Sequence, residues 1–382
     1  MANQSSKNSI TRRDLLRYTA GGMAASALTG CSTIGEGWGS SPDRSNDRPN
    51  VLVIFDDQLR TEACSIYGGK NITTPHMERM ARQGMTFNNA TSTCPLCTPY
   101  RGMLQTGRYP THSGLVLNWV EANPRQRCIA HVFNDAGYDT GFIGKWHLAA
   151  GVKKYDGYQI KTKQDAEKVK QIRDDYMKRN PETEYVPPGP QRLGYKHWQA
   201  FNFHCDFNNY YWYEDEPNKM YREGYETDIQ TDQTIEFMKQ RQNSGQPFFA
   251  MMAPHPPHPP FDPAWCPKGY LEKVPKDLHW LPNVPEGHKL RRDPDMARCY
   301  YSMCKNMDDN LGRILDYLDR SGLSKNTIVV FTADHGEMMG SQGRRNKMVP
   351  YSEAVNIPMI VRWPGHIPAG VRTNVLHTPM DH

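Results

Sequence analysis

The stretch Pro49-Asn50-Val51-Leu52-Val53-Ile54-Phe55-Asp56-Asp57 indicates the fold class of this chain. Its apolar residues follow one another without alternation, and the two aspartates stop the run abruptly. Continuous runs rich in β-branched residues are typical of strands that are buried on both faces, as in parallel sheets. We therefore predict a buried parallel strand that ends at the aspartates.

Further apolar runs predict strands of the same sheet at 140–143, 248–252, 327–332 and 358–362. Helical signals lie between these runs. Thr74-Pro75 predicts a helix start, Gly84 suits the position just after that helix, and residues 295–320 carry apolar side chains at helical spacing. The charged segment 161–179 reads as a solvated helical insert. Strands that alternate with helices imply an α/β fold with a large, mostly parallel sheet sandwiched between helices.

Composition excludes several classes of protein. The 382 residues (43.8 kDa) suffice for one large α/β domain or two ordinary ones. A mean hydropathy of −0.76, with no apolar run near the roughly 18 residues of a membrane span, excludes a polytopic membrane protein. The net charge of +5 is not gathered into basic arms, so we expect no nucleic-acid partner.

The N-terminal residues predict an export signal. Twin arginines at Arg12 and Arg13 precede a short, weakly apolar stretch at 18–30, which is typical of a Tat signal read by the Tat export machinery. Leu28-Thr29-Gly30-Cys31 is typical of a lipoprotein cleavage box, which would make Cys31 the lipid-bearing residue; a non-lipidated signal with a chance cysteine is the alternative.

These features define two N-terminal segments and predict where in the cell the protein is located. We assign residues 1–31 to the signal and 32–49 to a linker rich in Ser, Gly, Asp and Pro. We expect an exported protein that is periplasmic or held at the membrane only through a lipid anchor.

Acidic residues follow two of the predicted strands. Asp56-Asp57 ends the first, and Asp334-His335-Gly336-Glu337 follows the run at 327–332. Ligands of open α/β sheets gather at the carboxyl ends of strands, and converging carboxylates need a cation. Oxygen ligands favour Ca²⁺ or Mg²⁺, and the single His leaves Mn²⁺ open. Paired acids at strand ends are also common as caps or surface groups, so these residues alone leave both interpretations open.

A longer motif helps to decide between a cation site and acids that only cap strands or lie at the surface. Cys97-Thr98-Pro99-Tyr100-Arg101 continues through Gly102-Met103-Leu104-Gln105 to Thr106-Gly107-Arg108. This stretch resembles the maturation signal of the formylglycine-dependent sulfatases of the arylsulfatase type, in the alkaline phosphatase superfamily. Other blocks stand in the family's order: Asp56-Asp57, Gly144-Lys145-Trp146-His147, Pro254-His255-Pro256, Asp334-His335-Gly336-Glu337 and Lys347-x-x-x-Tyr351-x-Glu353.

The resemblance implies a fold and a reaction. It covers roughly residues 49–382 and implies that 50–382 form a catalytic domain with the alkaline-phosphatase-like sulfatase fold. In that family a formylglycine-generating maturation enzyme oxidises the cysteine, here Cys97, to an aldehyde. One hydroxyl of the hydrated aldehyde attacks the sulfur of a sulfate ester, and loss of the second hydroxyl's proton then releases sulfate.

The resemblance also implies roles for single residues. Metal ligation falls to Asp56, Asp57, Asp334 and His335 with modified Cys97, and Ca²⁺ is the expected ion. Arg101 would hold the hydrated aldehyde, Lys145 and Lys347 would bind sulfate, and His147 would take a proton. His255 would act on the leaving oxygen, alone or with Lys347, and His258 would contact substrate. Without the resemblance, solvated lysines and core histidines would be the ordinary interpretations.

Three functions follow as hypotheses. The leading one is a sulfatase that acts on sulfated carbohydrates. The alternatives are a phosphonate monoester or phosphodiester hydrolase of the same superfamily, and an inactive truncated remnant that binds sulfated glycans. The aromatic stretch at 208–213 is interpreted either as core or as rings that stack on a sugar.

The C-terminal end departs from the family pattern. Family members continue into a smaller C-terminal subdomain, whereas this sequence ends at His382. We therefore expect exposed apolar surface beside the strand at 358–362, with low solubility or weak activity that an appended family-like segment improves.

Overall fold

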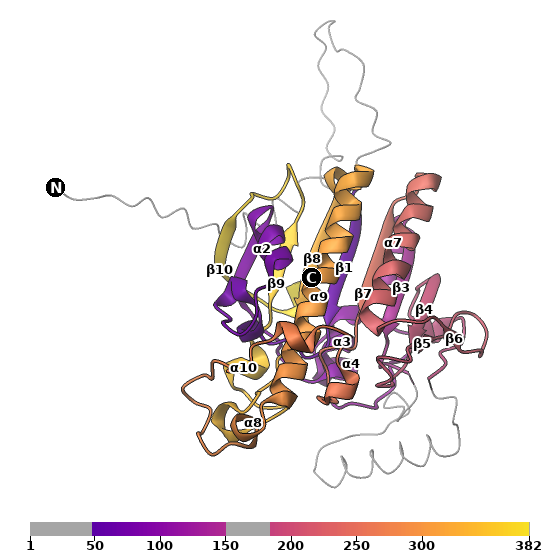
Figure 1. Ribbon diagram of the computed structural model, residues 1–382. Helices are drawn as coiled ribbons and strands as arrows, with labels where there is room; N and C mark the ends of the chain where they lie inside the picture. Colours follow the sequence, from indigo (N-terminus) through magenta and orange to yellow (C-terminus); the bar gives the residue numbers. More distant parts are fainter. Residues whose placement is uncertain (1–47, 150–183, 382) are drawn as a thin grey trace, which may run out of the picture.

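A mixed β-sheet forms the centre of the protein (Figure 1). The computed structural model describes residues 48–149 and 184–381. Within these ranges eight strands form the sheet in the order β10-β2-β9-β8-β1-β7-β3-β4. Their bounds are β1 Asn50–Asp56, β2 Met85–Ala90, β3 Asp139–Lys145, β4 His197–Phe201, β7 Phe248–Ala253, β8 Thr327–Ala333, β9 Met359–Arg362 and β10 Val371–His377. A separate two-stranded ribbon pairs β5 (Tyr211–Trp212) with β6 (Met220–Tyr221).

The predicted mostly parallel sheet is confirmed. β1 lies between β7 and β8 and runs parallel to both, and β3 runs parallel to β7 and β4. β9 is antiparallel to both of its neighbours, β8 and β2. Each predicted strand is present, but β2, β4 and β10 were not predicted. β2 carries adjacent exposed asparagines and β10 is a half-exposed edge strand, so neither has a buried strand's continuous apolar pattern.

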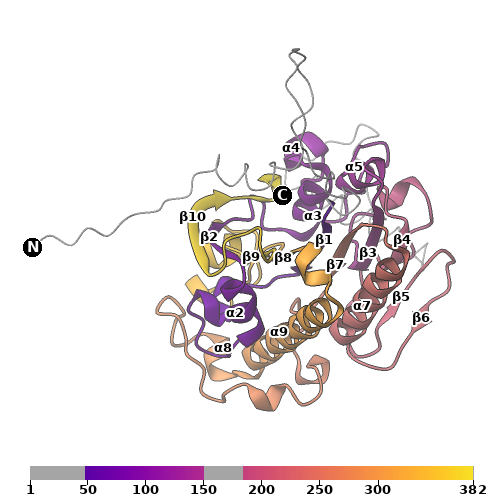
Figure 2. The same cartoon turned by 90° about the horizontal axis from the view of Figure 1, so that it is seen from above.

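Helices cover both faces of the sheet, as predicted (Figure 2). α2, α7 and α9 lie on one side, and α3, α4 and α5 lie on the other. The helix bounds are α2 Pro75–Arg82, α3 Cys97–Thr106, α4 Pro110–Ser113, α5 Ile129–Asp135, α7 Glu226–Ser244, α8 Lys289–Arg292, α9 Asp295–Ser321 and α10 Ser352–Val355. Among the helices of the described ranges, none is both long and apolar enough to cross a membrane.

Two helices follow the sequence pattern closely. α9 fully buries Leu311, Ile314, Leu315 and Leu318, the apolar positions that predicted it. α2 begins at Pro75 and Gly84 follows its cap, but this glycine does not adopt a positive φ. A Cβ there would lie 2.1 Å from the carbonyl oxygen of Val361, so the glycine permits close packing against β9.

The aromatic stretch at 208–213 belongs to the core. Tyr210, Tyr211, Trp212 and Tyr213 are all buried, with at most 7% of any side chain exposed. They pack with Phe201 and Ile229 in a cluster separate from the main core, and Tyr211 and Trp212 of this cluster form β5. Of the two interpretations of this stretch, the core interpretation is therefore correct.

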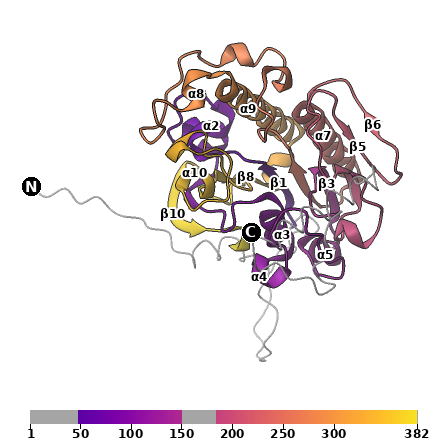
Figure 3. The same cartoon turned by 90° about the horizontal axis from the view of Figure 1, so that it is seen from below.

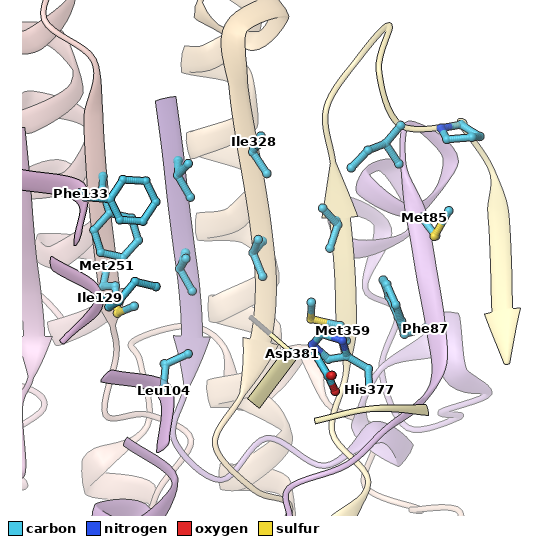
Figure 4. Close-up of a pocket in the computed structure, with 17 residues that line it drawn as sticks. Met85, Phe87, Leu104, Ile129, Phe133, Met251, Ile328, Met359, His377 and Asp381 are labelled. Atoms are coloured by element: carbon cyan, nitrogen blue, oxygen red, sulfur yellow. The ribbon is translucent and has the colours of Figure 1, made fainter. Parts of the chain in front are cut away.

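One face of the sheet carries an apolar groove of about 220 Å³ (Figure 4). Strands β1, β2, β7, β8 and β9 form its floor, and α3 and α5 form its side. The lining residues are Val51, Val53, Met85, Phe87, Leu104, Ile129, Phe133, Phe249, Met251, Ile328, Val330, Met359, Val361, Ile367, Pro368, His377 and Asp381. Met359 and Val361 of the strand predicted at 358–362 line this groove, where Met359 is buried and Val361 is half-buried.

The parallel strands deliver their ends to one edge of the sheet. β1, β3, β7 and β8 run in the same direction, so their carboxyl ends lie at the same edge of the sheet. This edge faces the viewer in Figure 3. The start of α3 lies at the same edge, because Cys97 contacts residues that follow β1 and β8. The candidate site was predicted from the sequence at this edge, at the carboxyl ends of the strands. The predicted signal, most of the linker and the insert at 161–179 lie outside the described residues.

Candidate active site

Four strand ends, helix α3 and the loop before α10 assemble the site. Every sequence-predicted site residue in the described ranges reaches it, whereas Cys31 lies outside those ranges. The contributions are Asp56 at the end of β1 and Asp57 just after it, Lys145 at the end of β3 and His147 just after it, His255 and His258 after β7, Asp334 and His335 after β8, Cys97 and Arg101 from α3, and Lys347 from the loop before α10.

The acidic residues form a site that fits a cation. Ligand atoms of Asp57, Cys97, Asp334 and His335 all lie within 4.8 Å of one another. Both carboxylate oxygens of Asp56 are buried and have no hydrogen-bond partner among residues 48–149 and 184–381. Burial, with Asp334 and Asp57 nearby, raises the pKa of Asp56 well above its ordinary value. Orphaned carboxylate oxygens beside other buried acids are the donor set that Ca²⁺ or Mg²⁺ prefers.

Cys97 lies at the first turn of α3 and faces this cluster. Its Sγ is 3.2 Å from Nε2 of His335 and 3.6 Å from Oδ1 of Asp57. Burial and Asp57 alone would raise the pKa of this thiol, but Lys145, Lys347 and His335 outweigh them and lower it. The positive end of the α3 dipole adds to the stabilisation of negative charge at this position.

Arg101 and Lys145 neutralise Asp57 from one side. Nη2 of Arg101 donates to Oδ2 of Asp57 (3.1 Å) and Oδ2 of Asp334 (3.4 Å), and Nζ of Lys145 donates to Oδ2 of Asp57. Burial favours the protonated carboxyl of Asp57, yet Lys145, His258 and Arg101 hold its pKa well below the ordinary value. Gly144 allows this approach: its φ is +105°, and a Cβ there would lie 2.4 Å from the carbonyl oxygen of Ala253.

His147 is a buried imidazole held only by ring contacts. Within the part of the chain that the structure describes, neither ring nitrogen has a hydrogen-bond partner, and the backbone φ of His147 is +56°. The rings of Trp119 and Phe203 lie 4.6 and 4.7 Å from its own. Burial, with Lys145 and Arg101 nearby, lowers its pKa well below the ordinary value, so the ring is neutral at neutral pH. A strained backbone and an unpartnered base are features of functional sites.

His255 and His258 border the site on the side of β7. Their ring centroids are 4.5 Å apart, and both pKa values are lowered by burial and by nearby lysines. Phe203, which sequence reasoning missed, lies between the basic residues. Its ring is 5.1 Å from that of His255 and 4.7 Å from Nζ of Lys145. No motif marks Phe203, because its place depends on β4 packing beside β3.

Lys347 reaches the site through Gln58, which sequence reasoning missed, and Glu337, which belongs to the Asp334-His335-Gly336-Glu337 block. Its Nζ donates to Oε1 of Gln58, and Nε2 of Gln58 donates to Oε2 of Glu337. Oε1 of Glu337 accepts from the backbone N–H of Met339 (3.1 Å) and of Asn346 (2.7 Å). Glu337 therefore fixes the loop that carries Lys347, and Gln58 orients the ammonium group. In the sequence, the signal that could have identified Gln58 as a site residue is its position directly after Asp56-Asp57.

Glu226 is a third missed residue, at the start of α7. Its Oε1 accepts from the backbone N–H of His255 (2.9 Å) and from Nε2 of Gln230 (3.0 Å). Burial raises its pKa to about 8, so this carboxyl is protonated at neutral pH. Glu226 thus positions His255 without adding a negative charge to the site.

Comparisons with known proteins agree with this geometry. The family model described as "Sulfatase" matches residues 49–382. The ulvan-active sulfatase of Formosa agariphila is 31% identical over 322 residues, which are 83% of this chain and 57% of that protein. The endo-4-O-sulfatase of Bacteroides thetaiotaomicron is 29% identical over 94% of this chain and 72% of that protein.

A solved structure shows the same fold. The YidJ protein of Bacteroides fragilis superimposes with a TM-score of 0.75 at 29% identity, over 90% of this chain and 74% of that one. From the family match and the relatives together, this chain belongs to the sulfatase family.

Proposed function

We propose that this protein hydrolyses sulfate esters of carbohydrates with a formylglycine formed from Cys97 and a divalent cation. The observation that carries the proposal is the position of Cys97. Its thiol is buried at the start of α3 and contacts both Asp57 and His335. The names of the relatives, which act on ulvan or remove 4-O-sulfate, support a carbohydrate substrate.

The modified side chain supplies the nucleophile, and this chain's own residues bind and orient the substrate. A hydrated aldehyde at position 97 offers one hydroxyl for attack on sulfur and a second whose deprotonation permits sulfate release. The ammonium group of Lys145 contacts Asp57, and that of Lys347 contacts Gln58, whose backbone N–H donates to Asp334. From these positions both lysines would bind sulfate oxygens. Arg101 would hold the side chain at position 97 and offset its developing charge.

Two histidines are suited to opposite proton transfers. His147 is neutral and has two unpartnered nitrogens, so it can accept the proton released from the hydrated aldehyde. Nδ1 of His255 donates to the carbonyl oxygen of His204 (2.6 Å), which leaves Nε2 for the substrate. A sulfate anion bound beside His255 raises the proton affinity of that ring, and the ring can then protonate the leaving oxygen.

The acidic cluster would hold the cation. Asp56, Asp57, Asp334 and His335 are the ligands, and Ca²⁺ is the ion that we propose for this oxygen-rich set. When bound, the cation would act as a Lewis acid and lower the pKa of the nucleophile. It would also cancel the charge of three buried carboxylates, which otherwise repels a sulfate anion.

A comparison of two substrates tests the reaction class. We expect protein from a host with a formylglycine-generating enzyme to hydrolyse an aryl sulfate and sulfated oligosaccharides faster than an aryl phosphonate. Cys97→Ser is the control, because it keeps the size of the side chain and removes the oxidisable thiol. Faster turnover of the phosphonate would assign the chain to phosphonate hydrolysis. Binding of sulfated glycan without turnover by the modified protein would assign it to glycan binding alone.

We also propose that residues 1–31 direct export and that Cys31 carries the lipid. The twin arginines and the box that ends at Cys31 support this. Replacing Arg12 and Arg13 by lysines should retain the protein in the cytoplasm. Cys31→Ser should release the exported protein from the membrane fraction.

A further inference from the structure

A second group of ligating side chains lies beside the acidic cluster. Cys205, His255 and His258 each offer one ligand atom, and these atoms all lie within 4.8 Å of one another. Cys205 follows β4, and the two histidines follow β7. The carboxylates of the acidic cluster are not part of this group, which consists of one thiol and two imidazoles.

Hydrogen bonds fix both imidazoles in the same tautomer. Nδ1 of His255 lies 2.6 Å from the carbonyl oxygen of His204, and Nδ1 of His258 lies 2.8 Å from the carbonyl oxygen of Pro259. A carbonyl can only accept, so Nδ1 carries the hydrogen in each ring and Nε2 keeps its lone pair. Nε2 of His255 is buried and has no hydrogen-bond partner in the described protein.

This is the arrangement that backbone carbonyls impose on metal-binding histidines. A hydrogen bond at one ring nitrogen orients the ring and raises the basicity of the other nitrogen toward a metal. A thiol with two such imidazoles suits Zn²⁺, Co²⁺ or Cu²⁺, whereas Ca²⁺ and Mg²⁺ require oxygen ligands. The two neighbouring groups therefore differ in the kind of ion they bind.

We propose that Cys205, His255 and His258 form a binding site for a soft divalent transition-metal ion. Binding replaces the thiol proton of Cys205, which leaves to solvent, by a sulfur–metal bond. Three protein ligands leave the fourth tetrahedral position open to water or substrate. An ion at this site occupies Nε2 of His255, the atom that the proposed function assigns to the leaving oxygen, and so blocks turnover.

Cobalt absorption tests the site without relying on turnover. The protein is Cys97→Ser with Ca²⁺ in excess, so that position 97 offers no thiolate and the acidic cluster is occupied. Co²⁺ should produce a near-ultraviolet thiolate-to-cobalt absorption with a stoichiometry of one, and Zn²⁺ should abolish it. The absorption should be lost in Cys97→Ser/Cys205→Ser and retained in Cys97→Ser/Cys94→Ser, because Cys94 is half-buried and lies outside the group.

Two outcomes would overturn the proposal: no thiolate absorption in Cys97→Ser, or equal absorption after Cys205→Ser. Should Cys205→Ser fail to fold, His258→Gln in the Cys97→Ser background keeps the thiol and should raise the Co²⁺ midpoint at least tenfold. An unchanged midpoint would equally contradict the site. Failure of the proposed sulfatase activity would leave the absorption in place, so the two proposals fail separately.

Discussion

The thiol of Cys97 lies 3.2 Å from Nε2 of His335, although 238 positions separate the two residues in the sequence. α3 brings the cysteine from one side of the sheet, and the end of β8 brings the histidine from its edge. The contact joins the oxidisable position to the acidic cluster. Nucleophile and cation are therefore expected to act at one place, and the predictions below follow from that arrangement.

Asp56→Asn should have opposite effects on stability with and without Ca²⁺. The parent carboxylate is buried without a partner, so the neutral amide should raise the melting temperature of metal-free protein. The same change removes a ligand and should abolish most of the stabilisation by Ca²⁺, which reaches about 2.7 kcal/mol at a hundredfold excess over the dissociation constant. Thermal unfolding with chelator and with Ca²⁺ measures both effects. A chelator-treated parent that keeps full activity would contradict the cation assignment.

Gln58→Ala should weaken substrate binding through Lys347. The change removes the acceptor for Nζ of Lys347 and one donor to Glu337. We expect kcat/KM for a sulfate ester to fall about ten- to a hundredfold, mainly through a higher KM. Gln105→Ala is the matched control, because Gln105 is a buried glutamine that accepts from Tyr195. If Gln58→Ala left KM unchanged and lost as much stability as Gln105→Ala, the role of Gln58 would be structural alone.

Arg101→Met should destabilise the fold as well as abolish turnover. The guanidinium is 1% exposed and contacts two buried carboxylates, so its removal leaves Asp57 and Asp334 with less compensation. We expect a loss of about 3–5 kcal/mol in the free energy of unfolding of metal-free protein. Arg127→Met breaks the exposed pair with Asp135 and should cost less than about 1 kcal/mol. Denaturant titration of both variants would show equal losses if burial were unimportant.

Glu226→Gln should change how stability depends on pH. Folded Glu226 keeps its proton up to pH about 8, whereas the unfolded residue loses it near the ordinary value of 4.5. Between these values the folded state holds the extra proton, so its contribution to stability falls as pH rises, by at most about 1.4 kcal/mol per unit. The neutral amide lacks this dependence.

Unfolding free energies at pH 5 and pH 8 measure this effect. The stability of Glu226→Gln relative to the parent should rise between the two pH values. Glu236→Gln, an exposed glutamate on the same helix, should follow the parent at both. Parallel behaviour of Glu226→Gln and the parent would mean that Glu226 is ionised in the folded protein.

Much of the fold and site could be predicted because the signals are local. The apolar run before Asp56 predicted the central strand, and the spacing in 295–320 predicted α9 within one residue. The motif around Cys97 predicted the residues that meet at the strand ends. Gln58, Phe203 and Glu226 were missed because their roles depend on which distant backbone or side chain each one touches. Edge strands such as β10 were missed because a half-exposed strand has a weak pattern.

Peptide mass spectrometry across positions 94–101 tests the central claim most directly. The protein should come from a host with a formylglycine-generating enzyme and be trapped with an aldehyde reagent. Cys97 alone has a proline two residues on and an arginine four residues on, so we predict an aldehyde at position 97 and an intact thiol at Cys94. Active protein in which Cys97 remains a thiol, or in which position 94 carries the aldehyde, would contradict this account.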